Sequence, residues 1–191
     1  MALVHHPVYN RLGEVIAAAL TNLDLHDLAR VAATYGARRC FIITPLDDQR
    51  ALARRLIAHW VEGFGAEHNA DRKRAMGLLA VTAALEEAME AIREDCGGAS
   101  PRLIATAARE GMGPRVEYND LAQSLNDAGP PCLLLFGTAS GLAEDLLKMV
   151  DAVLPPIEGV GGYNHLSVRS AAAIVLDRLR AAGSPPCGGV D

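Results

Sequence analysis

Residues 132–142 read CLLLFGTASGL, a run of apolar residues followed directly by a turn that contains two glycines. Residues 132–136 include no polar side chain apart from a cysteine, which predicts a strand buried on both faces, as in a parallel sheet. Ligands of parallel α/β sheets bind beyond the carboxyl ends of the strands, and glycines let the backbone approach a ligand closely. The turn 137–141 is therefore a candidate binding loop, although the same glycines are also typical of an ordinary tight turn.

Shorter apolar runs on both sides of this segment alternate with stretches of helical periodicity. Strands are expected at 2–4, 40–43, 103–106 and 152–154, and helices at 24–35, 49–61, 72–93, 118–126, 142–149 and from 166 onward. This alternation predicts an α/β fold with a mostly parallel sheet flanked by helices. We expect a single domain over 1–182, a helical elaboration of it at about 50–93, and a flexible tail at 183–191.

Local signals predict where some of these elements begin and end. Asp24 is expected to cap the first helix, and Gly36 is expected to end it. Residues 64–71 have the composition of a polar loop that contains glycine. Residues 15–20 form an apolar run that is compatible with either a strand or a helix.

The composition argues against several classes of protein. Cys40, Cys96, Cys132 and Cys187 are far apart, so we expect neither disulfides nor a zinc site and interpret them as reduced thiols of a cytoplasmic protein. The six histidines have no metal-ligand spacing, and no metal is expected. No stretch approaches the roughly 20 apolar residues of a membrane span, and the first residues do not resemble a signal peptide. A net charge of −5 argues against a surface that is basic throughout.

Two common nucleotide-binding motifs are missing from the sequence. It contains no G-x-x-x-x-G-K-[ST] segment, and no glycine-rich loop follows the first expected strand, which argues against a P-loop and against a dinucleotide-binding Rossmann fold. The glycine-rich segments lie late in the chain, at 137–141 and 155–165. This pattern indicates a cofactor pocket built from the C-terminal third.

Three segments together resemble the motifs of SPOUT-class methyltransferases. Residues 22–36 (NLDLHDLARVAATYG) resemble the first motif, 134–142 (LLFGTASGL) the second, and 163–173 (YNHLSVRSAAA) the third. They occur in the family order and cover nearly the whole chain, in a pattern similar to a bacterial subfamily of tRNA and rRNA methyltransferases. The resemblance implies a deep C-terminal trefoil knot, a feature so rare that periodicity could not have predicted it.

The same resemblance implies that S-adenosylmethionine binds in the loops of the knot, held largely by backbone groups. By position, the implied cofactor contacts are Thr106, Gly137, Thr138, Gly141, Ile157, Tyr163, Leu166 and Val168. The implied substrate is a nucleotide of structured RNA, and the implied assembly is a homodimer that packs through the knotted region. The apolar stripe of the last helix is compatible with such packing, but it could equally face its own sheet.

Arg30, Asn164 and Ser167 are the implied catalytic residues. In relatives that methylate ribose, an arginine of the first motif lies near the acceptor, and Arg30 holds that position. From the residues alone, Arg30 could instead form a surface ion pair with Asp27, three positions earlier. At the start of the last helix, either substrate contact or capping is open to Asn164, Ser167 and Arg169.

The acceptor atom is left open by two departures from the family pattern. Many ribose-methylating relatives have Glu in the second motif and Asn in the third, where this chain has Ser140 and Ser167. The expected reaction is therefore methylation of either a ribose 2′-hydroxyl or a base. A non-catalytic RNA-binding module and a methyltransferase with a non-RNA substrate are the alternatives.

Two clusters of cations are candidates for contact with RNA phosphates. One consists of Arg50, Arg54 and Arg55 on an expected helix, and the other of Arg72, Lys73 and Arg74, with Arg109 and Arg115 as further candidates. RNA binding needs positive charge, but either cluster could also be an ordinary solvated helix face. The pair His59-Trp60 is expected to pack the helical elaboration onto the sheet.

Overall fold

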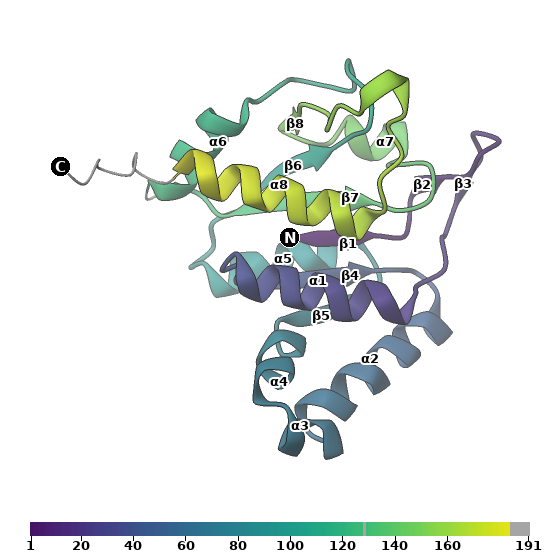
Figure 1. The fold of residues 1–191 in the computed structure, drawn as a ribbon, viewed down its shortest axis with the longest axis vertical. Coiled ribbons are helices and arrows are strands. Elements are labelled where there is room, and N and C mark those ends of the chain that lie inside the picture. The colour runs from purple at the N-terminus through teal and green to yellow at the C-terminus, as the bar shows by residue number, and fades with distance from the viewer. Residues whose placement is uncertain (128, 184–191) are drawn as a thin grey trace.

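A six-stranded sheet forms the centre of the computed structural model, which describes residues 1–127 and 129–183 (Figure 1). Its strands are β1 (Ala2–Val4), β4 (Cys40–Ile43), β5 (Leu79–Thr82), β6 (Arg102–Thr106), β7 (Cys132–Gly137) and β8 (Ala152–Leu154). They lie in the order β5-β4-β1-β7-β6-β8, and every neighbouring pair is parallel. The predicted α/β fold with a mostly parallel sheet is confirmed. Cys187 and most of the predicted tail lie outside the described residues.

The strand β7 illustrates why the central strands are apolar at nearly every position. Successive side chains of a strand point to opposite faces of the sheet. Leu134 and Phe136 accordingly pack into one hydrophobic cluster, and Leu133 and Leu135 pack into the other. Because helices cover both faces, none of these four positions has a face left for a polar side chain.

Five helices cover the two faces of the sheet. One face carries α1 (Asn22–Thr34), α6 (Tyr118–Asn126) and α8 (Val168–Gly183), and the other carries α5 (Leu85–Asp95) and α7 (Glu144–Leu147). Helix α8 buries Ala172, Val175, Leu176 and Leu179 in the core of its own chain. The apolar stripe predicted for the last helix therefore faces its own sheet and neighbouring helices.

The helices α2 (Asp47–Val61), α3 (Phe64–His68) and α4 (Ala70–Met76) extend away from the β5 edge of the sheet (Figure 1). We call residues 47–76 the helical projection. Its inner side packs against α1 through Trp60, Ala75 and Met76. Trp60 packs against the core cluster and meets His26 of α1, whereas His59 is exposed, so only one residue of the pair His59-Trp60 has a packing role.

Two predictions in this region are wrong. Residues 72–93 do not form one helix, because α4 ends at Met76 and is followed by β5 and then α5. The strand β5 pairs with β4 along its whole length, so tertiary pairing overrides the helical propensity of an alanine-rich segment. Residues 64–71, expected as a loop, contain α3 and the start of α4.

The first helix also begins differently from the prediction. Thr21, not Asp24, is the N-cap of α1, and its Oγ1 accepts a hydrogen bond from the Asp24 N–H at 3.2 Å. The Asp24 carboxylate accepts in return from the Thr21 N–H at 3.3 Å, which completes a capping box. Gly36 follows the helix as expected. Of the apolar run 15–20, only β3 (Val15–Ile16) is a strand, and it forms a short hairpin with β2 (Val8–Tyr9).

The strand order reverses beside β1. The chain runs from β1 to β4 and β5 on one side, and then fills the other side with β6, β7 and β8. Strands β1 and β7 are therefore adjacent, with Val4 opposite Gly137. In open parallel sheets, ligands bind outside the carboxyl edge at such a reversal. The trefoil knot stays a prediction.

Candidate functional site

Three strands end side by side at the carboxyl edge of the sheet. Strand β6 lies between β7 and β8, with Ala105 opposite Leu135 and Thr106 opposite Leu154. The Thr106 Oγ1 donates a hydrogen bond to the Leu135 carbonyl oxygen at 3.0 Å, which holds this side chain against β7. The structure thus brings the loops after Thr106, Gly137 and Leu154, all expected at the cofactor site, to one edge.

The glycine at the end of β7 is required by the packing of the turn itself. A Cβ at Gly137 would lie 2.8 Å from the Leu142 nitrogen and 2.9 Å from the Leu142 Cγ. The Leu142 nitrogen belongs to the backbone and cannot move aside cheaply. Of the two interpretations left open by the sequence, a tight turn therefore accounts for Gly137 without any ligand.

Hydrogen bonds inside the chain hold the rest of this turn. The Thr138 N–H and Oγ1 both donate to the Val4 carbonyl oxygen, at 3.2 and 3.0 Å, and the Gly141 N–H donates to the Thr138 carbonyl oxygen at 3.0 Å. The β2–β3 hairpin binds the outer side, where the Tyr9 N–H donates to the Gly141 carbonyl oxygen at 2.9 Å. The N–H groups of Thr138 and Gly141 therefore already donate hydrogen bonds within the chain and are not free to donate to a ligand.

The loop before α8 and the helix itself line a half-open hollow of about 190 Å³. Its lining residues are Ile157, Glu158, Gly159, Tyr163, Asn164, His165, Leu166 and Ile174. Three of them, Ile157, Tyr163 and Leu166, are predicted cofactor residues. Because ligand pockets commonly measure about 300–1,000 Å³, this mostly apolar cavity is smaller than a typical ligand pocket.

Asn164 joins two of the loops at this edge. Its Nδ2 donates a hydrogen bond to the Ala108 carbonyl oxygen at 2.8 Å, which links the loop before α8 to the loop after β6. The neighbouring Tyr163 is 70% exposed, and its ring meets His165 edge-on at 5.3 Å. The Asn164 side chain therefore holds loop structure, and it is Tyr163 that is open to solvent.

Ser167 is the residue that caps the last helix. It directly precedes α8, and its Oγ accepts a hydrogen bond from the Ser170 N–H at 3.2 Å. The predicted cofactor residue Val168 follows it as the first residue of α8 and packs against the core. Capping, one of the roles left open for Asn164 and Ser167, thus belongs to Ser167.

Arg169 connects the first and third sequence motifs, a role that the sequence did not indicate. Its Nη1 lies 2.9 Å from the Asp24 Oδ1, and its Nε lies 3.2 Å from the Asp27 Oδ2. The Asp24 side chain is only 8% exposed, so this is a largely buried ion pair between the first turns of α8 and α1.

Arg30 lies exposed on α1, on the same side of the helix as Asp27. The ion pair with Asp27 that the sequence left open is not formed, because Arg169 takes that carboxylate. Within residues 1–127 and 129–183, Arg30 makes no hydrogen bond or ion pair. It is therefore an available cation about one helical turn from the junction of α1 and α8.

His5 is fully buried where the strand order reverses, directly after β1. Neither ring nitrogen has a hydrogen-bond partner in the described part of the chain. Burial lowers the pKa of His5, and the nearby Asp24 carboxylate opposes this effect only in part. Because its pKa is lowered, the imidazole is neutral at pH 7.

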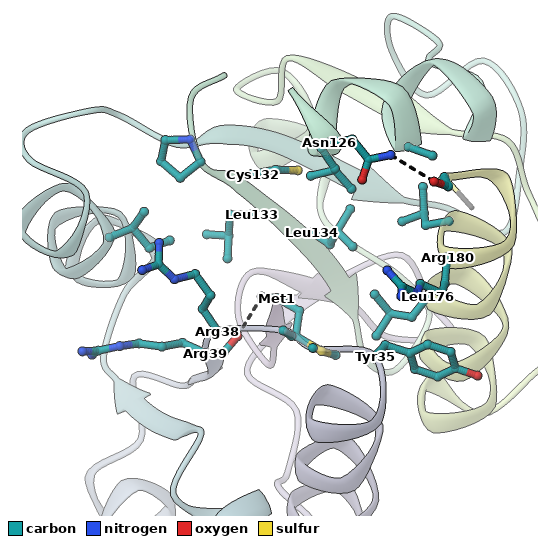
Figure 2. A pocket seen from close by; sticks show the side chains of 18 of the residues that line it. Met1, Tyr35, Arg38, Arg39, Asn126, Cys132, Leu133, Leu134, Leu176 and Arg180 are labelled. Atoms are coloured by element: carbon teal, nitrogen blue, oxygen red, sulfur yellow. Dashed lines mark hydrogen bonds between the residues drawn. The ribbon is translucent and has the colours of Figure 1, made fainter. Parts of the chain in front are cut away.

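A second cavity, of about 710 Å³, lies at the opposite edge of the sheet (Figure 2). Met1, Arg39 and Cys132, which adjoin or begin strands β1, β4 and β7, line it together with Leu176 and Arg180 of α8. Figure 2 shows Arg38 and Arg180 on either side of Met1 and Leu134. Because this cavity faces the amino ends of the strands, it contains none of the predicted site residues.

Metal binding and membrane crossing receive no support from the described residues. No group of three or more His, Cys, Asp and Glu side chains there could hold a metal ion. In the same residues, no helix is long and apolar enough to cross a bilayer.

Comparison with solved structures and families identifies the class of this protein. AviRb from Streptomyces viridochromogenes, a SpoU methyltransferase solved with its cofactor AdoMet, superposes with a TM-score of 0.52 at 17% identity, over 83% of this chain and 55% of that chain. This chain thus shares the fold of that SpoU methyltransferase. Residues 1–181 match the family model described as "SAM-dependent RNA methyltransferase", and the chain belongs to this family.

Two sequence relatives differ in how much of their length this chain covers. A protein of Oleidesulfovibrio alaskensis named tRNA (guanine-N(1)-)-methyltransferase is 46% identical over 178 residues, which are 93% of this chain but 41% of that protein. An uncharacterized protein of Aquifex aeolicus is 37% identical over 179 residues, which are 94% of this chain and 86% of that protein. The chain therefore spans less than half of the named relative and most of the unnamed one.

Proposed function

We propose that this chain transfers the methyl group of S-adenosylmethionine to a nucleotide of structured RNA, with residues 1–182 acting as a single methyltransferase domain. The observation that carries the proposal is the meeting of the loops after β6, β7 and β8 at one edge, in a chain of the SAM-dependent RNA methyltransferase family. The name of the O. alaskensis relative makes transfer RNA the first substrate to test. The guanine-N1 specificity in that name belongs to a protein more than twice as long, so we do not transfer it to this chain. The proposed acceptor is either a ribose 2′-hydroxyl or a base.

The proposed cofactor site lies between Thr106, the turn after β7 and the loop 155–167. The apolar cavity beside Ile157, Tyr163 and Leu166 supports binding of the adenine ring there. We propose that the walls of this cofactor site are formed by Gly137, Thr138, Gly141 and Val168. The bound cofactor would supply an electrophilic methyl group on its sulfonium, so the main task of the chain is to hold the acceptor in line with that carbon.

Arg30 is proposed to contact the acceptor nucleotide. A guanidinium remains protonated, so Arg30 can orient the acceptor and stabilise negative charge that develops on it, but it cannot take up the proton. The hydrogen bonds from Asn164 to Ala108 and from the Ser170 N–H to Ser167 support positioning roles for Asn164 and Ser167, which hold the loop beside the cofactor. The solvent is the proposed destination of the proton.

We further propose a cytoplasmic homodimer that packs through the knotted region. The apolar stripe of α8 is buried in its own chain, so the interface would use Leu23 of α1 and Val160, Tyr163 and Leu166 of the loop before α8. These side chains are 60, 97, 70 and 47% exposed, and exposed apolar groups of this size support an interface.

The proposed cytoplasmic location agrees with the state of Cys40. Burial raises the pKa of Cys40 to about 11, which agrees with a thiol that stays reduced and protonated.

The direct test of the proposed function is transfer of a tritiated methyl group from S-adenosylmethionine to total transfer RNA. We expect radioactivity in the acid-insoluble fraction, and we expect ribonuclease treatment to release it. Cofactor binding without transfer to any RNA would instead favour a non-catalytic module. Label that resists ribonuclease would favour a substrate other than RNA.

Replacement of Arg30 tests its proposed role. Arg30→Ala is expected to lower kcat/KM by at least about 100-fold, as loss of a charge-stabilising donor does, with the Kd for S-adenosylhomocysteine unchanged by calorimetry. Arg38→Ala, which removes an exposed arginine at the opposite edge of the sheet, serves as the control and should keep full turnover. Weaker cofactor binding with intact turnover in Arg30→Ala would contradict the assignment.

A further inference from the structure

We propose that the helical projection binds unpaired nucleotides of the RNA by stacking them on the ring pair Phe64–His68, while Arg55, Lys73 and Arg74 hold the phosphates. This inference rests on the proposed function, because it names the part of the chain that recognises the RNA. It also specifies the kind of RNA, since bases inside a duplex are stacked on their neighbours and offer no free face to a protein ring.

The first observation is a preformed aromatic pair at the tip of the projection. The Phe64 side chain is 69% exposed and packs into neither hydrophobic cluster. Its ring lies 4.1 Å from the His68 ring at an interplanar angle of 27°, and the His68 Nδ1 lies 3.0 Å from the Phe64 carbonyl oxygen. Both residues belong to the single turn of α3, so the stack is held in one geometry. Such a stack offers an open ring face to a base.

The second observation is that the three helices of the projection are fixed around Trp60. A Cβ at Gly65 would lie 2.6 Å from the Trp60 Cε3, so α3 packs directly on the indole. The Arg72 guanidinium of α4 lies 4.6 Å from the centre of the Trp60 ring, and His26 of α1 meets that ring edge-on at 5.6 Å. The ring pair of α3 is therefore held at a defined position relative to α1.

The third observation separates structural cations from available ones. Arg50 donates to the Thr44 carbonyl oxygen at 2.8 Å, Arg54 donates to the Val81 carbonyl oxygen at 3.3 Å, and Arg72 lies on Trp60. These three cations, half of the two clusters seen in the sequence, are thus used within the fold.

The remaining cations, Arg55, Lys73 and Arg74, are exposed and make no ion pair within the described parts of the chain. On α4, Ala75 and Met76 are buried while Lys73 and Arg74 are exposed, so these two cations occupy the outward side of the helix. The projection holds six Lys and Arg against five Asp and Glu, whereas the whole chain holds 18 against 23. The balance of charge is therefore more favourable to phosphates here than over the chain as a whole.

The projection is also continuous with the proposed acceptor site. Helices α1 and α4 pack together, and His26 lies on α1 one turn before Arg30. Burial lowers the pKa of His26, and the charges of Arg72 and Arg30 lower it further, so both cations lie near this ring. A strand of RNA with its acceptor at Arg30 can therefore extend past Arg72 toward the projection.

The test compares two fluorescein-labelled RNA probes, a stem-loop and a blunt duplex of the same stem, by fluorescence anisotropy. Phe64→Ala should weaken stem-loop binding about fivefold or more, as expected for one lost stacking contact, with little change for the duplex. Phe64→Tyr, which keeps the ring, should bind like the original protein. Arg74→Glu should weaken binding of both RNAs and reduce the salt dependence, whereas Arg38→Glu, with the same change in charge, should not.

Several results would overturn the inference. One is unchanged stem-loop binding in Phe64→Ala, and another is an equal loss for Arg38→Glu and Arg74→Glu. A third is Phe64→Ala that binds RNA normally but sediments at a lower mass, which would make the ring pair a protein interface. If Phe64→Ala binds and methylates RNA normally, only this inference fails. If the original protein neither binds nor methylates RNA, the proposed function fails as well.

Discussion

Asp24 and Arg169 lie 145 positions apart in the sequence, and their side chains meet at 2.9 Å. Asp24 also completes the capping box with Thr21, so its buried carboxylate has partners on both sides. Arg169 follows Ser167, which caps α8 and ends the loop of the proposed cofactor site. One arginine therefore ties the position of that loop to the helix that carries Arg30.

Arg169→Met, which keeps the length of the side chain and removes its charge, tests this connection. It should lower the free energy of unfolding by about 1–3 kcal/mol, because a buried carboxylate loses its cation; this is less than for a fully buried pair, since Arg169 is 29% exposed. Affinity for S-adenosylhomocysteine should fall as well. Asp27→Asn is the control: its side chain is 46% exposed, and it should cost less than about 1 kcal/mol. Equal costs in urea unfolding would contradict the account.

Gly137 distinguishes a structural glycine from a ligand-binding one. Because a Cβ there would lie 2.8 Å from the Leu142 nitrogen, Gly137→Ala should lower the free energy of unfolding by about 1–3 kcal/mol and Tm by roughly 2–10 °C. Gly129→Ala is the matched control, since among the described residues its Cβ would meet only the Ser124 carbonyl oxygen, at 3.7 Å. If Gly137→Ala keeps its Tm in a thermal melt but loses cofactor affinity, the glycine serves the cofactor and not the turn.

Strands β1, β4, β6, β7 and β8 could be predicted because each is a short apolar run that stands apart from its flanking segments. Strand β5 could not, because Leu79–Thr82 lies inside an alanine-rich stretch of helical composition. Its extended conformation comes from pairing with β4, and such pairing depends on contacts distant in sequence. Because β5 was not predicted, α4 and α5 were predicted as one helix, and the end of the helical projection could not be recognised.

Among the site residues, those with partners close in the sequence could be predicted, and those with distant partners could not. Capping by Ser167 involves a residue three positions away, and the sequence carries that signal. The bond from Asn164 to Ala108 and the ion pair from Arg169 to Asp24 join segments 56 and 145 positions apart. No local pattern predicts such partners, and the structure alone assigned them.

In the fold as a whole, the carboxyl ends and the amino ends of the parallel strands carry different chemistry. The carboxyl edge carries the loops after β6, β7 and β8, the α1–α8 junction and Arg30. The amino edge carries the larger cavity, lined by Met1, Arg39 and Arg180 among others. Cavity size alone would favour the amino edge, whereas the strand order and the family motifs favour the carboxyl edge.

A crystal structure with S-adenosylhomocysteine tests the proposed cofactor site most directly. We expect ligand density between Thr106, the turn after Gly137 and the Tyr163–Leu166 part of the loop before α8. Ligand density in the cavity beside Met1, Arg38 and Arg180, with the carboxyl edge unchanged, would contradict it.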